Sequence, residues 1–104
     1  MDTLKNQIIE YMDNAQCSKK LSGYNIILHV ISTAVEHPEY NCRLLFASYV
    51  KSTGNKLSMY EEAFERERLN AYRDARYCLS KSGSNKSMLD FIRNGVMQLS
   101  TSES

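Results

Sequence analysis

The residues of this chain whose chemistry suits a nucleic acid follow Ser58, in a segment that is predicted to form one long amphipathic helix through Cys78. Ser58-Met-Tyr-Glu61 is a capping box, in which the serine hydroxyl accepts from an amide of the first turn and the glutamate side chain reaches back to the serine amide. At about 100° per residue, one side of this helix is acidic in its first two turns and basic in its later turns: Ser58, Glu61, Glu62, Glu65, Arg66, Leu69, Arg73 and Arg76. Arginine pairs with guanine and a carboxylate accepts from cytosine, so this face has groups that could read bases.

The candidate base-reading residues are those of the first turns, Ser58, Glu61, Glu62, Glu65 and Arg66. The candidate phosphate contacts are the basic residues around the helix, Lys19, Lys20, Lys51, Lys56, Arg66, Arg73 and Lys81. Three carboxylates facing a polyanion are unfavourable unless basic neighbours offset them. The alternative stays open that acids at the start and bases toward the end simply complement the helix dipole.

The other side of the same helix is predicted to face the core, through Tyr60, Ala63, Phe64, Ala71, Ala75 and Cys78. Glu67 falls near the middle of this stripe. We expect its carboxylate either to reach solvent or to pair with a basic residue of another helix.

Catalytic, metal and cofactor sites are not predicted. His29 and His37 have no supporting spacing for nucleophilic catalysis, and there is no Gly-rich phosphate loop. Three cysteines without a CxxC motif indicate reduced thiols that partly fill the core rather than a zinc site or a disulfide framework. Tyr11, Tyr24, Tyr60 and Tyr72 lie at helical spacing and are expected in the core.

The 104 residues carry 42% hydrophobic and 24% charged residues, with one Pro and four Gly. This composition predicts one globular domain over residues 1–99 and a disordered tail over 100–104. The net charge of +1 excludes a strongly basic, non-specific nucleic-acid binder. No signal peptide or long apolar run is present, so we expect a cytoplasmic protein with no membrane partner.

Hydrophobic periodicity predicts an all-α fold of about five helices. The first covers residues 4–15, and the second begins after an N-cap at Ser22 and ends at Glu36 before Pro38. The third covers residues 43–51 and is ended by Gly54; the fourth is the Ser58 helix. The last is capped by Ser87 and reaches Leu99, with Gly95 allowing close packing. The third and fourth together, over about 43–79, have the form of a helix-turn-helix.

Three stretches in this order resemble the C-terminal DNA-binding effector domain of the master sporulation response regulator of endospore-forming bacteria (stage-zero sporulation protein A). They are Leu21-Ser-Gly-Tyr24 with the helix after it, Arg43-Leu-Leu-Phe-Ala-Ser-Tyr-Val-Lys51 followed by Asn55-Lys-Leu-Ser-Met-Tyr-Glu61, and Asn85-Lys-Ser-Met-Leu-Asp-Phe-Ile92. The resemblance covers most of residues 21–99. It implies a small helical bundle in which the Ser58 helix enters the major groove of DNA.

The chain departs from that family in three respects. The loop before the helix-turn-helix is about three residues shorter by this alignment of motifs. No receiver-like segment precedes the match, so we expect no aspartate phosphorylation switch. Glu62 and Glu65 stand where the family typically has arginines.

The leading hypothesis is a sequence-specific transcriptional regulator that binds duplex DNA. The alternative is an interaction module of the same fold that no longer reads DNA and pairs with a related regulator or another protein, as the acidic residues suggest. A homodimer through the last helix is also predicted, because Met88, Phe91, Ile92 and Val96 offer more apolar surface than one terminal helix needs.

Overall fold

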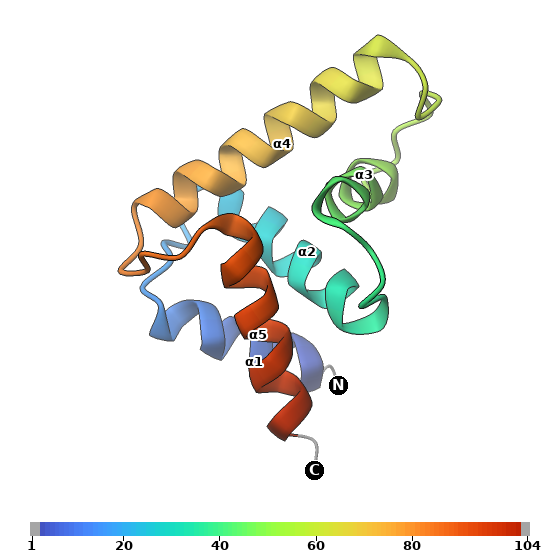
Figure 1. The fold of residues 1–104 in the computed structure, drawn as a ribbon. Helices are drawn as coiled ribbons and strands as arrows, with labels where there is room; N and C mark the ends of the chain where they lie inside the picture. The colour runs from blue at the N-terminus through green and yellow to red at the C-terminus, as the bar shows by residue number, and fades with distance from the viewer. Residues whose placement is uncertain (1–2, 103–104) are drawn as a thin grey trace.

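The protein is a bundle of five helices, shown by a computed structural model that describes residues 3–102 (Figure 1). No strand occurs within that range. The helices follow in the order α1 (Thr3–Asn14), α2 (Gly23–Glu36), α3 (Cys42–Ser52), α4 (Glu62–Ser80) and α5 (Met88–Ser102). The all-α prediction is confirmed.

Helix α2 is the centre of the bundle and contacts each of the other four helices. Its sequence explains this position, because apolar residues cover a broad face of the helix, and a face of that width must be buried. Ile27, Val30 and Ile31 are fully buried, and Ile26 is nearly so. The other helices each present one apolar face to α2 and leave the opposite face to solvent.

The ends of α2 are set by different means. His37 precedes Pro38 and has φ −131° and ψ 72°, outside the helical region, as a residue before proline should. At the other end Ser22 occupies the N-cap position that the sequence predicts, but its backbone is helical and its hydroxyl caps no amide. The predicted capping bond is therefore wrong, although the boundary is right.

Helix α3 begins at Cys42 and is capped by Asn41, whose side-chain oxygen accepts from the Leu44 amide at 2.9 Å. It ends before Gly54, whose φ of 83° is the left-handed conformation predicted for this glycine. Helix α4 then lies across α2 and α3 as the long helix of Figure 1.

Helix α5 faces the core with Met88, Phe91 and Ile92, which are 4% exposed or less, and Val96 packs partly buried against them. The apolar surplus from which a homodimer was predicted is therefore absent, because these residues fill the protein's own core. The Ser87 hydroxyl accepts from the Asp90 amide at 3.3 Å, which confirms the predicted cap. The helix runs on to Ser102, so the tail predicted from residue 100 is helical that far; residues 103–104 lie outside the described range.

Candidate nucleic-acid interface

Helix α4 has the buried and exposed faces that its sequence predicts. Phe64, Ala71, Ala75 and Cys78 are buried against the bundle, together with Leu79. The outward face carries Glu62, Arg66, Leu69, Arg73 and Arg76, all of which are exposed. Nineteen residues at about 1.5 Å each make this face roughly 28 Å long.

The start of α4 differs from the prediction. The capping-box bonds form, since the Ser58 amide donates to Glu61 Oε2 at 2.7 Å and the Tyr60 amide donates to Ser58 Oγ at 3.2 Å. They close only an isolated turn, because Glu61 is extended with φ −82° and ψ 145° and the helix begins at Glu62. Ser58 and Glu61 are therefore exposed residues of the connection, not of the first helical turn.

Tyr60 is 99% exposed, which contradicts its predicted place in the core. A helical wheel does not apply to a residue that precedes the helix, and this is the reason for the error. The α3–α4 connection spans residues 53–61, longer than the three or four residues usual for a helix-turn-helix turn. The helix-turn-helix identity of α3 and α4 stays a prediction.

Glu65 is turned from the outward face toward α3. Its carboxylate accepts from Arg68 Nε at 3.1 Å and lies 3.4 Å from Nη2 of Arg43, at the start of α3. The Arg68 hydrogen bonds, with the charges of Arg68 and Arg43, hold the pKa of Glu65 below its usual value. Of the predicted base-reading residues in α4, the structure therefore leaves Glu62 and Arg66 on the outward face.

Among the predicted phosphate contacts, Arg66 and Arg73 lie on the outward face of α4 and the lysines divide between its two ends. At its start, Lys56 is exposed, whereas the Lys51 ammonium donates to the Leu57 carbonyl and lies 5.3 Å from the centre of the Phe64 ring. Lys51 therefore already has partners that hold the connection against α4.

At the far end of α4 the structure brings Lys81 near the connection between α1 and α2. The Cys78 thiol lies 3.9 Å from the Ser18 carbonyl, which places Lys19 and Lys20 beside the last turns of the helix. Lys19 pairs with Asp13 at 3.6 Å, and the Lys81 ammonium lies 5.4 Å from the Tyr77 ring centre.

Sequence reasoning missed the partners of two carboxylates. Arg68 is three residues after Glu65, a spacing that favours an ion pair on a helix, but Arg43 is brought there only by the fold. Glu67 is exposed and accepts from the side-chain amide of Asn55, rather than pairing with a basic residue. This bond ties the connection to the second turn of α4.

A cavity of about 350 Å³ between α1, α2 and α3 is lined by His29 and Ser52 among other residues, with Nε2 and Oγ 3.5 Å apart. The Ser52 hydroxyl donates to the Tyr49 carbonyl at 2.8 Å, so its proton points away from the imidazole. This geometry does not prepare serine as a nucleophile, which would need its proton on the imidazole. Burial lowers the pKa of His29, and the charge of Glu36 opposes that shift.

The three thiols are free, with Cys17 and Cys78 buried and Cys42 partly buried. Burial, with smaller contributions from Cys78 and Asp13, raises the pKa of Cys17 to about 11. Within residues 3–102 no three His, Cys, Asp or Glu side chains gather as metal ligands would. None of the described helices is both long and apolar enough to span a membrane.

Comparisons with protein families, with curated proteins and with solved structures found no match to this chain.

Proposed function

We propose that this chain is a DNA-binding transcriptional regulator that lays the outward face of α4 against duplex DNA. The observation that carries the proposal is the state of the three arginines on that face. Arg66, Arg73 and Arg76 are exposed, and among the described residues none of them has an ion pair or a side-chain hydrogen bond. Unpaired guanidinium groups spaced along one helix face are suited to phosphate oxygens.

The acidic residues oppose DNA binding less than their number in the sequence suggests. Glu65 is neutralised by Arg68 and Arg43 and points toward α3. Glu67 accepts from Asn55 and does not lie on the arginine face. Glu62 is thus the carboxylate of α4 that would meet the DNA together with the arginines.

Base recognition is assigned to Glu62 and Arg66, which are one helical turn apart on the outward face. A guanidinium can donate two hydrogen bonds to guanine, and a carboxylate can accept one from the cytosine amino group. Arg73, Arg76, Lys56 and the lysines near the end of α4 would contact the phosphates on either side. The resemblance to the sporulation regulator effector domain supports the same role for this helix.

The test is a fluorescence-anisotropy titration of random-sequence duplexes, followed by selection of bound sequences. The expected result is binding at about 50 mM salt that weakens steeply toward 200 mM, because released counterions drive it. Selection should enrich one motif. If the protein binds no better than a neutral control protein at about 50 mM salt, the proposal is wrong.

One observation favours an interaction module as the second candidate function. Tyr60 is 99% exposed and Met59 45% exposed, at the tip of the connection beside Glu61 and Glu62. Exposed aromatic and methionine side chains are enriched where proteins bind proteins. Replacing Glu61 and Glu62 by Arg distinguishes the two functions. If the protein is an interaction module, the wild type binds no DNA and the double variant can begin to bind it. If the protein reads DNA, the wild type binds and the double variant prefers a different sequence.

A further inference from the structure

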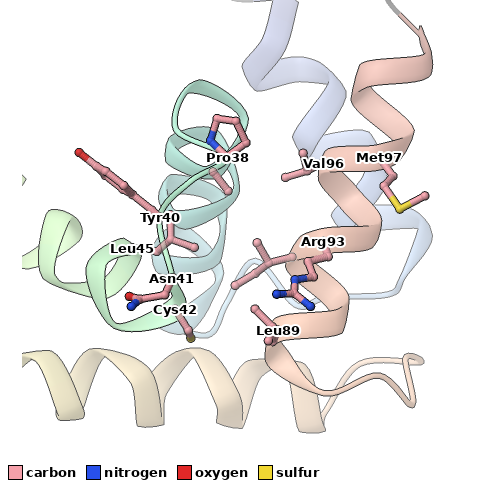
Figure 2. Close-up of a pocket in the computed structure, with 11 residues that line it drawn as sticks. Pro38, Tyr40, Asn41, Cys42, Leu45, Leu89, Arg93, Val96 and Met97 are labelled. Carbon is pink, nitrogen blue, oxygen red and sulfur yellow. The ribbon is translucent and has the colours of Figure 1, made fainter.

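A cavity of about 250 Å³ opens between α5 on one side and the end of α2, the following loop and the start of α3 on the other (Figure 2). Its walls are apolar, formed by Ala34, Leu45, Ile92 and Val96, with Leu89 and Met97 at the exposed edges. The last two are 37% and 68% exposed, so the cavity is continuous with an apolar part of the surface.

The one charged side chain among the residues that line the cavity is positive. Arg93 of α5 lines the cavity, and Figure 2 shows its side chain on that helix beside Leu89. No Asp or Glu is among the lining residues, and Arg93 has no ion pair among the described residues. The nearby Glu39 of the loop lies instead 3.3 Å from Nδ1 of His37.

Asn41 lines the same cavity as an uncharged polar residue. The side-chain oxygen of Asn41 is occupied by the Leu44 amide, at 2.9 Å, as the cap of α3. Its amino group keeps two hydrogens to donate. An occupant therefore meets apolar walls with a guanidinium beside them, a combination that suits an acid with a hydrocarbon body.

We propose that this cavity binds a small amphipathic monocarboxylate, with its carboxylate on Arg93 and its hydrocarbon chain against Leu45, Ile92 and Val96. An apolar cavity of about 150 Å³ accommodates benzene, so this larger one has room for a chain of about eight carbons. The binding does not depend on the proposed DNA-binding function, and its test uses no DNA.

The test is a titration of the isotope-labelled protein with octanoate and, separately, with 1-octanol, followed by amide chemical shifts. Octanoate is expected to shift amides in residues 38–45 and 89–97 and to bind about tenfold more tightly than octanol, because only the acid forms the charged hydrogen bond. Arg93→Gln should weaken octanoate binding about tenfold and leave octanol binding unchanged. Lys86→Gln, which removes a positive charge outside the cavity, should change neither.

Three results would each overturn the proposal. The first is the absence of shifts at about 5 mM octanoate, a concentration that reveals even millimolar affinity. The second is equal affinity for acid and alcohol, or octanoate binding that is unaffected by Arg93→Gln. The third is a shift of the same amides with protein concentration alone, which would mean that a second copy of the chain fills the cavity.

Discussion

Gly23 of α2 lies directly against the backbone carbonyl of Asp74 in α4. A Cβ at residue 23 would stand 2.1 Å from that oxygen and 2.9 Å from the Cα of Ala75. The two helices therefore meet backbone to backbone at this point, where only glycine fits. This contact fixes which face of α4 is turned inward, and hence that the arginine face is turned to solvent.

Gly23→Ala should lower the free energy of unfolding by about 3 kcal/mol or more, because the overlap is with rigid backbone that can be relieved only by separating α2 from α4. Urea denaturation followed by circular dichroism measures the change. Gly83→Ala is the matched control, since the Cβ there comes within 3 Å only of the flexible Gln16 side chain, at 2.6 Å. Equal stability of wild type and Gly23→Ala would show that the two helices do not meet as described.

Replacing the two N-cap residues should lower the free energy of unfolding by different amounts. Asn41→Ala should lower it by about 1 kcal/mol, because the side-chain oxygen of Asn41 accepts a hydrogen bond from the Leu44 amide. Ser22→Ala should change the stability by less than about 0.5 kcal/mol, since the Ser22 hydroxyl makes no cap bond. Thermal unfolding of both variants compares them directly. A larger loss for Ser22→Ala than for Asn41→Ala would contradict the structure.

His29 should make the stability depend on pH. Burial lowers its pKa in the folded protein below the usual 6.5, so the unfolded chain takes up the proton more readily. The stabilising contribution of neutral His29 is then complete above pH 6.5 and decreases as the pH falls through that value toward the folded pKa. Urea denaturation of wild type and His29→Gln over this range should show wild type losing more stability than the variant. If the stability difference between wild type and variant does not change with pH, the lowered pKa of the partly buried His29 is ruled out.

The cysteines should react with iodoacetamide in a defined order. Cys42 is partly buried, whereas Cys17 and Cys78 are 7% and 0% exposed. The pKa of Cys17, about 11, also keeps nearly all of it as the unreactive thiol. Peptide mass spectrometry of the native protein should find Cys42 modified first, and the other two only after urea is added. Early modification of Cys17 or Cys78 would mean that the core opens around them.

Much of the fold could be predicted from the sequence, because helices such as α2 and α5 have strong periodicity and clear boundary residues. Pro38 ends one and Ser87 begins the other. The prediction for Gly95 is also confirmed, since a Cβ there would lie 2.8 Å from the Tyr11 ring. These signals are local and act within a few residues.

The start of α4 could not be predicted in the same way. The hydrogen bonds of Ser58 and Glu61 fit a helix start and an isolated turn equally well, and the extended backbone of Glu61 decides between them. The pairing of Glu65 with Arg43 joins two helices, and the Arg93 cavity joins α5 to the end of α2. No local pattern contains such contacts, so the turning of Glu65 away from the α4 face toward Arg43 was visible only in the folded chain.

The central claim is that the arginine face of α4 binds duplex DNA, and the salt dependence of binding tests it most directly. The measurement compares the slope of log affinity against log salt for wild type, for the triple variant Arg66→Gln/Arg73→Gln/Arg76→Gln, and for the control Lys86→Gln. We expect the triple variant to bind far more weakly and its slope to be smaller by about 0.9 for each of the two phosphate contacts, Arg73 and Arg76, while the control changes little. An unchanged affinity and slope in the triple variant would contradict the claim.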